Sequence, residues 1–277
     1  MPNPKQLPHI IKLLDDDSPT VHESVMKELA SFGTSLEVEL ARLTIVLTPD
    51  QKEVVQHLLD DQRRTWIRDN WSRWFTLEHD KHRLEGALSL LAQFLSGLKY
   101  HVSVKNLLDR LAKEYTATHK RLNARTLANF LFKEQRLKGA VPDDYFNPQN
   151  SNLLYVIEKK RGIPISLACV YILVGYRLGL KIEGCNFPGH FLAIAYTGMK
   201  KVIVDGFSGG KFIDEKTLAN LDTPVPIKLE QLTSLECNAD EIIARILRNL
   251  INAYQLRKDE ANQQLVIGLL GMMQNLS

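Results

Sequence analysis

The sequence predicts an α+β protein that is mostly helical and has one small antiparallel sheet. Three observations predict this class. Leucine, isoleucine and valine recur at spacings of three and four over most of the chain, for example over residues 84–137, which is typical of helices with one buried face. Between residues 181 and 207 the pattern changes to short runs of β-branched and aromatic residues. After residue 238 the helical spacing returns in two segments, which predicts a C-terminal helical hairpin.

The composition is that of an ordinary globular protein. The 277 residues are 44% hydrophobic and 24% charged, with a net charge of +3. Because basic and acidic residues are interspersed, we expect no arm dedicated to nucleic-acid binding. The longest apolar stretches are shorter than the ~18 residues that a membrane span requires. The first residues also lack the pattern of a secretory signal. We therefore expect a cytoplasmic protein that does not insert into membranes.

The cysteine and histidine residues predict no metal site and no cofactor. Cys169, Cys185 and Cys237 are too widely spaced for a zinc knuckle or a disulfide framework, which favours a reducing compartment. His79 and His82 lie one helical turn apart and could share a metal ion. The sequence around them, however, offers no third ligand at a suitable spacing.

Residues 5–98 are predicted to be helical throughout. Ser18 is expected to cap a helix whose first residue is Pro19, and Gly33 is expected to end it. The succession of a short helix, an aspartate-rich turn and a longer helix resembles a HEAT-type repeat. A second helix pair is predicted over residues 36–61.

The segment "TWIRDNWSRWF" combines tryptophan and arginine. Such rings and guanidinium groups could stack on nucleic-acid bases or bind a peptide. We favour packing instead, because tryptophan is mostly buried in globular proteins. The residues concerned are Trp66, Trp71, Trp74, Arg63, Arg64, Arg68 and Arg73.

Two closely spaced helices are predicted in the middle of the chain. Ser151 is expected to cap a helix over residues 152–160, and Gly162 is expected to end it as the left-handed residue that follows a helix. Pro164 then starts a second helix, which is expected to stop at Gly179.

Strands are predicted at residues 181–187, 190–196 and 201–207, the last two joined as a hairpin. With the turn centred between Gly198 and Met199, Leu192 lies opposite Asp205. His190 and Asp205 then become diagonal neighbours on one face, with backbones ~7–8 Å apart.

Three residues suggest a site for acyl transfer. Ser166 lies in the first turn of the predicted helix, where free N–H groups and the helix dipole would stabilise a nucleophile. His190 would be its base, and Asp205 would orient the imidazole. Cys169, one turn further along the helix, is an alternative nucleophile. In the simpler interpretation, Ser166 caps the helix and His190 supports a tight turn.

The segments "DDYFNPQNSNLLYVIEKKRGIPISLACVYILVGYRLGL" and "EGCNFPGHFLAIA" resemble the SirB-type transglutaminase-like family of bacterial proteins. The resemblance implies a papain/transglutaminase-like core and a tetratricopeptide-like tail. It also implies that the Cys-His-Asp triad of catalytic relatives falls on Ser166, His190 and Asp205. Serine stands here in place of the catalytic cysteine, and the SirB-type family is similar in lacking that cysteine. The matching residues are Tyr145, Pro148, Asn150, Ser151, Arg161, Gly162, Pro164, Ile165, Phe187, Pro188, Gly189, His190, Phe191, Asp205, Phe207, Gly209 and Gly210.

We therefore expect three parts: a HEAT-like region (1–98), a transglutaminase-like core (99–235) and a short tetratricopeptide-like tail (236–277). A serine hydroxyl is far less acidic than a thiol, so we expect a pseudoenzyme that acts as a protein-interaction or regulatory module. Layers of helical repeats form groove-shaped surfaces, which favours a protein or peptide partner over nucleic acid. The alternative is a hydrolase or acyltransferase that uses Ser166, or Cys169, with His190 and Asp205.

Overall fold

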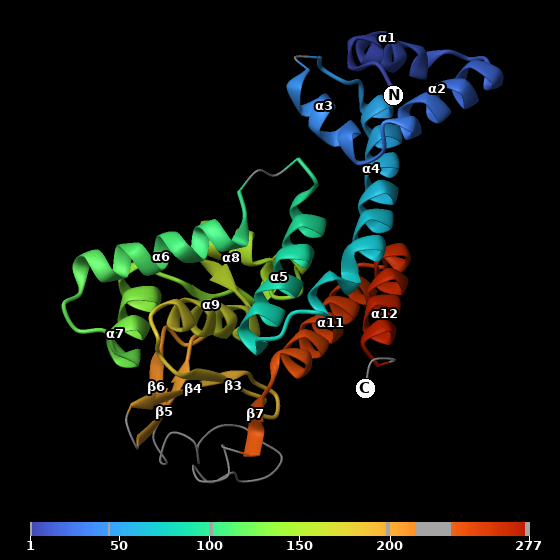
Figure 1. Ribbon diagram of the computed structural model, residues 1–277. Coiled ribbons are helices and arrows are strands. Elements are labelled where there is room, and N and C mark those ends of the chain that lie inside the picture. The colour runs from blue at the N-terminus through green and yellow to red at the C-terminus, as the bar shows by residue number, and fades with distance from the viewer. Residues whose placement is uncertain (1, 44, 100–101, 198–199, 214–233, 275–277) are drawn as a thin grey trace. The chain divides into compact units, whose positions relative to one another are not determined.

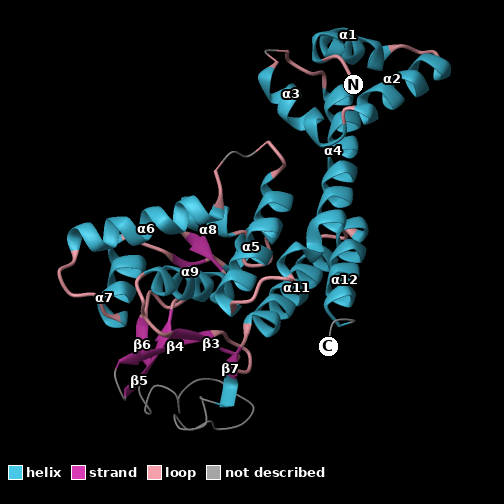
Figure 2. Cartoon of the chain, in the orientation of Figure 1, coloured by secondary structure: helices cyan, strands magenta, loops and turns pink. Residues whose placement is uncertain are grey.

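The computed structural model describes residues 2–43, 45–99, 102–197, 200–213 and 234–274, which form two compact units (Figure 1). Unit 1 comprises Met1–Asn70 and Gly97–His101, and unit 2 comprises Trp71–Ser96 and Val102–Ser277. The predicted fold class is confirmed: the chain is α+β and mostly helical, with a small antiparallel sheet and a C-terminal helical hairpin (Figure 2). The predicted parts 1–98, 99–235 and 236–277 stay predictions.

Unit 1 consists, in its described residues, of helices around one apolar core. Its elements are η1 (Pro4–Gln6), α1 (Leu7–Lys12), η2 (Leu13–Asp15), α2 (Pro19–Ser31), η3 (Gly33–Ser35), α3 (Leu36–Arg42) and α4 (Pro49–Asn70). Side chains spaced three or four residues apart on these helices turn inward and exclude water. The core includes Leu7, Ile11, Leu29, Phe32, Leu36, Val55 and Leu59.

The ends of α2 agree with the prediction, although one capping detail was wrong. The helix starts at Pro19 and ends at Ser31, and Gly33 has the positive φ of 51° that stops a helix. The Ser18 side chain makes no capping hydrogen bond. Instead its backbone N–H donates to Asp16 Oδ1 at 2.9 Å. The predicted second pair is α3 and α4, and α4 continues beyond residue 61 to Asn70.

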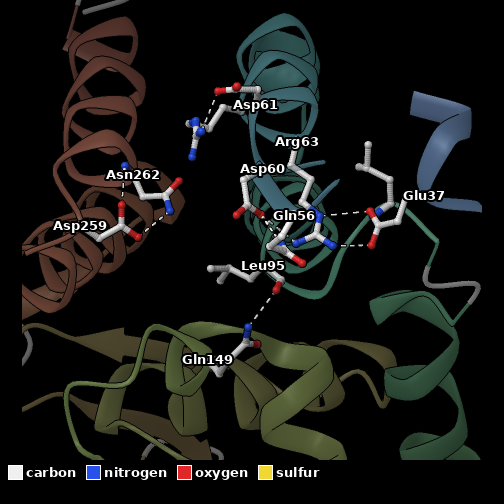
Figure 3. Close-up of polar contacts among 11 residues, drawn as sticks. Glu37, Gln56, Asp60, Asp61, Arg63, Leu95, Gln149, Asp259 and Asn262 are labelled. Carbon is white, nitrogen blue, oxygen red and sulfur yellow. Dashed lines mark hydrogen bonds and ion pairs between the residues drawn. The ribbon is translucent and has the colours of Figure 1, made fainter. Parts of the chain in front are cut away.

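Glu37, on α3, is a buried charged residue whose hydrogen bonds connect separate segments of unit 1. Its carboxylate accepts hydrogen bonds from the Arg63 guanidinium on α4 and, at 2.7 Å, from the Leu98 backbone N–H (Figure 3). Gly97 has a φ of 98°, and a Cβ there would collide with the Glu37 carboxylate. This carboxylate therefore ties residues 97–98 to α3 and α4, which explains why that segment belongs to unit 1.

Unit 2 is arranged around α9 (Pro164–Arg177), which packs against the sheet and against α6 and α8 (Figure 1). Residues 164–175 of this helix are all buried. In the described residues no helix is long and apolar enough to cross a membrane. The other helices in the described part of the unit are η4 (Trp71–Trp74), α5 (Asp80–Ser96), α6 (Val104–Thr118), α7 (Ala124–Asn129), the π-turn η5 (Phe130–Glu134), η6 (Pro142–Asp144), η7 (Pro148–Ser151), α8 (Leu153–Lys159), α11 (Ala239–Leu256) and α12 (Glu260–Gln274).

The main sheet has the strand order β6-β5-β4-β3-β7, and all its pairings are antiparallel. The predicted hairpin and its register are confirmed, since the pairs run from Ala193 opposite Val204 to Thr197 opposite Lys200. The predicted turn residues 198–199 lie outside the described residues. The strands are β3 (Ile182–Cys185), β4 (Leu192–Thr197), β5 (Lys200–Asp205), β6 (Lys211–Ile213) and β7 (Glu236–Cys237), and β1 (Lys138–Gly139) and β2 (Arg161–Gly162) form a separate parallel pair.

Two details around α8 differ from the prediction. Asn152, not Ser151, caps this helix, because its side chain accepts a hydrogen bond from Leu154 N at 3.0 Å. Gly162 does not provide the left-handed residue that ends it. Lys160 does so instead, with a φ of 61°, and Gly162 belongs to β2. A left-handed lysine has no sequence signature comparable to that of glycine.

Two of the three tryptophans are packed inside unit 2. Trp71 and Trp74 are 0% and 1% exposed, and their rings meet edge to face at 5.7 Å. The Trp71 indole N–H donates to Leu269 O on α12 at 3.0 Å. Burial leaves these two rings no face on which a base could stack, which favours the packing interpretation. Trp66 lies on α4 in unit 1 and is partly buried.

We expect Glu37→Ala to lower the free energy of unfolding by about 3 kcal/mol, because it removes one partner of a buried ion pair. It also leaves the Leu98 N–H without its acceptor. Urea denaturation measures the change. The control is Glu39→Ala on the same helix, which breaks an exposed pair with Arg42 and should cost less than about 0.5 kcal/mol. Equal losses in the two variants would contradict the role assigned to Glu37.

Candidate functional site

Ser166 lies in the first turn of α9 and points into the protein. It is 0% exposed, and its hydroxyl group donates to the carbonyl oxygens of Asn150, at 2.7 Å, and Ile163, at 2.9 Å. The space around it is tight, because a Cβ on Gly162 would lie 2.7 Å from Ser166 Oγ. In the described residues, none of its hydrogen bonds goes to His190. The hydroxyl group therefore joins α9 to the connector that precedes α8.

Cys169, the alternative nucleophile, is completely buried on the same helix. Burial in apolar surroundings raises the pKa of its thiol. The thiolate is the nucleophilic form of cysteine, so this environment suppresses the reactive species. Cys169 has the environment of a core residue.

His190 lies in a tight loop between β3 and β4 that α11 holds in place. Its backbone N–H donates to Phe187 O at 3.1 Å, and Gly189 takes a positive φ of 72°. Arg245 of α11 donates to His190 O at 2.9 Å and to Phe187 O at 3.3 Å, and it also bonds the Asn186 side chain. This arginine closes the loop, which fixes the position of the imidazole.

Asp205 ends β5 and makes direct contact with His190. The distance between His190 Nε2 and Asp205 Oδ1 is 3.0 Å, and the two side chains are 22% and 7% exposed. Asp205 also accepts hydrogen bonds from the backbone of Phe207 at 2.9 Å and from the Ser208 hydroxyl group at 2.7 Å. The register of the β4–β5 hairpin, as predicted, brings the imidazole and the carboxylate together. The predicted strand start at His190 was wrong, because β4 begins at Leu192 and His190 lies in the loop before it.

The environment of Asp205 favours its charged form. Burial alone would raise the pKa of this carboxyl group, but the hydrogen bond and charge of His190 and the bonds from Ser208 outweigh burial. The pKa therefore lies below the usual 3.8. An ionised Asp205 orients the imidazole through Nε2, and no described residue is hydrogen-bonded to Nδ1. The pair can thus offer Nδ1 to a ligand.

Aromatic residues pack beside this pair. The Phe207 ring lies edge to face with the His190 imidazole at 6.1 Å, and Tyr145 lies edge to face with Phe207 at 6.0 Å. Burial raises the pKa of the Tyr145 hydroxyl group, so it stays a neutral hydrogen-bonding group. The sequence motifs contained Tyr145 and Phe207 but gave no reason to assign them to the site. Arg245 and Ser208 were missed, because neither has a spacing that points to His190.

The predicted site residues therefore divide into two groups. The structure brings the partly exposed His190 and the buried Asp205 together at one end of the sheet. Ser166 and Cys169 are buried in α9, and among the described residues neither is hydrogen-bonded to His190. An acyl-transfer site requires the nucleophile within hydrogen-bond reach of its base. The catalytic roles of these residues stay predictions.

Comparison with known proteins identifies the class of this chain. The profile of the transglutaminase-like superfamily matches residues 99–248, which is more than half of the chain, so the chain belongs to this superfamily. That region contains α9, the sheet and the His190–Asp205 pair. No solved structure matches the chain.

Several curated proteins are similar to parts of the chain. A UPF0162 protein of Xylella fastidiosa strain Temecula1 is 36% identical over 119 residues, which cover 40% of this chain and 42% of that protein. A UPF0162 protein of Pseudomonas aeruginosa is 32% identical over 111 residues, covering 39% and 41%. F-box only protein 21 of Mus musculus is 25% identical over 154 residues, covering 50% and 24%. The chain thus spans less than half the length of these relatives.

We expect His190→Ala to raise the pKa of Asp205, because the variant removes the hydrogen bond and charge that oppose burial. Titration of the carboxyl carbon by NMR measures this pKa. In the wild type, the stability that the lowered pKa provides is present above about pH 4 and is lost as the pH falls through the folded-state pKa. An unchanged Asp205 pKa in the variant would show that His190 does not stabilise the carboxylate.

Proposed function

We propose that the chain is a non-catalytic, SirB-type transglutaminase-like protein that acts as a protein-interaction or regulatory module. The observation that carries this proposal is the environment of Ser166. Its hydroxyl proton is shared between two backbone carbonyl oxygens inside the protein, and its side chain is 0% exposed. A base at His190 would have to break buried hydrogen bonds before it could take that proton, and each buried polar group left unpaired costs about 1–3 kcal/mol.

The alternative is a hydrolase or acyltransferase in which Ser166 or Cys169 attacks a substrate. The contact between His190 and Asp205 favours it, since an aspartate-oriented imidazole is the base of such sites. The alternative lacks an accessible nucleophile: Ser166 and Cys169 are both 0% exposed. In our proposal the same pair serves as a polar group for ligand recognition.

The partner in this proposal is a protein or peptide, and the site of action is the cytoplasm. The helices flanking the core support this view. α1 and α2 pack as a pair in unit 1, consistent with the proposed HEAT-like region, and α11 and α12 pack as a pair in unit 2, consistent with the proposed tetratricopeptide-like tail. Paired helices of this kind present extended surfaces to peptides. The proposal requires no cofactor.

We expect the native chain to resist labelling at Ser166 by an alkyl fluorophosphonate and at Cys169 by iodoacetamide. Both residues are buried, and the Cys169 thiol is kept protonated. Peptide mapping by mass spectrometry detects the modified residues. The chain denatured in urea is the control, and there iodoacetamide should modify Cys169, Cys185 and Cys237.

The enzymatic alternative makes the opposite prediction. Native Ser166 or Cys169 would be modified, and the modification would disappear in His190→Ala. Amidase, peptidase and acyl-transfer turnover by the wild type, absent from the same variant, would have the same meaning. Either result would overturn the proposed function.

A further inference from the structure

Unit 2 carries a concentration of positive charge where β1 pairs with β2. The pairing brings together two segments, residues 133–138 and 158–161. These segments contain six basic residues and two acidic ones, so their local surplus exceeds the net charge of +3 of the whole chain. We call the six basic residues the basic patch: Lys133, Arg136, Lys138, Lys159, Lys160 and Arg161.

Backbone pairing and uncharged acceptors hold the basic patch together. Lys138 lies opposite Arg161 in the parallel register, and the Lys138 N–H donates to Lys160 O at 3.1 Å. The Arg161 guanidinium donates to Gly139 O at 3.1 Å, and Lys160 Nζ donates to Gln135 Oε1 at 3.3 Å. Both acceptors are neutral, so these contacts fix the two side chains and leave their charges in place.

No carboxylate in the part of the chain that the structure describes forms an ion pair with any of these six side chains. Elsewhere in unit 2 the fold supplies such partners, as Asp240 does for Arg83 at 2.6 Å. The two acidic residues of the segments have other contacts. Glu134 Oε1 lies 3.3 Å from His119 Nε2, and Glu158 also has an interaction of its own. The charge of the basic patch therefore remains available to a ligand.

Helix ends explain only part of the basic patch. Lys159 and Lys160 lie at the end of α8, where the last carbonyl groups favour a cation. Lys138 and Arg161 lie in strands and gain no such stabilisation. Burial lowers the pKa of Lys160, and the positive charge of Arg110 on α6 acts in the same direction. An anionic ligand would relieve the repulsion among these groups.

The surroundings of the basic patch favour a short acidic peptide over a nucleic acid. Neither segment contains an aromatic residue, whereas single-stranded nucleic acids bind largely by stacking on aromatic rings. The chain turns acidic shortly after β1, at Asp143 and Asp144 in η6, which would repel a phosphate backbone that continued past the patch. Val141, just before them, is 45% exposed and offers apolar contact to a peptide side chain.

The basic patch is also connected to the His190–Asp205 pair. A Cβ added to Gly139 in β1 would lie 2.6 Å from the Phe207 ring, and that ring lies edge to face with the His190 imidazole at 6.1 Å. One aromatic ring therefore separates β1 from the imidazole. A few residues of extended peptide span such a distance, since each adds about 3.3 Å.

We propose that the basic patch binds an acidic segment of a partner protein. Carboxylates of the segment pair with Lys138, Arg161 and the neighbouring cations, and an apolar side chain of the segment covers Val141. Clustered basic side chains are a recurring means of recognising acidic motifs. This inference rests on the proposed function, since it names the chemistry of the protein partner and the surface that binds it.

The test uses the full chain and two fluorescent peptides of about ten residues, each with one central leucine. One peptide is rich in glutamate and the other in lysine. Fluorescence anisotropy should show that the glutamate peptide binds at least about tenfold more tightly, and that salt weakens its binding. The double variant Lys138→Glu/Lys159→Glu, at two exposed positions, should weaken the glutamate peptide by about tenfold or more.

Arg136 and Lys258 provide a matched pair of variants. Both are exposed and left-handed, with φ values of 60° and 58°, so glycine fits either position without backbone strain. Each glycine variant removes one cation and retains the fold. Arg136→Gly should weaken the glutamate peptide about threefold, whereas Lys258→Gly, in the turn after α11 and outside the basic patch, should change little.

Several results would overturn the inference: no binding of the glutamate peptide, equal affinity for both peptides, or equal effects of Arg136→Gly and Lys258→Gly. Tighter binding of a single-stranded oligothymidine of similar length, or of vesicles that contain phosphatidylserine, would also overturn it, because the patch would then serve a nucleic acid or a membrane surface. None of these results bears on whether Ser166 reacts. Labelling of Ser166 in the native chain would overturn the proposed function alone, so the two failures are distinguishable.

Discussion

The hydrogen bond from Ser166 to the Asn150 carbonyl group fixes the start of the central helix, and the rest of unit 2 is built on that helix. Asn150 is itself 0% exposed, and its side-chain amide donates to backbone carbonyl groups of Asp144 and Tyr145 in the preceding connector. One buried serine and one buried asparagine therefore join the connector to α9. Gly162 is required beside them, because any Cβ there would press on Ser166 Oγ.

This arrangement keeps Ser166 and Cys169 buried while a histidine and a carboxylate meet at His190 and Asp205. α9 packs against β3 and β4, so its position determines where the loop with His190 emerges from the sheet. Arg245 then closes this loop from α11, and Asp205 holds the imidazole from β5. A fixed imidazole with one free nitrogen suits ligand recognition as well as catalysis, and our proposal assigns these contacts to recognition.

Much of the fold and part of the site could be predicted from the sequence. The register of the β4–β5 hairpin followed from its turn and from alternation along the strands, and it correctly placed Asp205 near His190. The left-handed Lys160 and the two-residue strand β7 could not be predicted, because tertiary contacts rather than local propensity stabilise them. The direction in which the Ser166 side chain points could not be predicted from the sequence either. It depends on a carbonyl group sixteen positions away in the chain.

The role of Arg245 illustrates the same limit. In the sequence it is one of several charged residues on an amphipathic helix, with nothing to link it to a loop more than fifty positions earlier. Only packing of α11 beside the sheet makes it the residue that holds His190. Long-range polar contacts of this kind position the site, and local sequence patterns do not encode them.

The most direct test of the central claim is the reactivity of a thiol placed at the start of α9 by Ser166→Cys. The rate of its reaction with iodoacetamide is measured against pH, with Cys169, Cys185 and Cys237 as internal references. If the side chain at this position is buried against the connector, the introduced thiol will react as slowly as those buried cysteines. A fast reaction at neutral pH that is lost when His190→Ala is added would contradict the claim, because it would reveal a nucleophile position served by the imidazole.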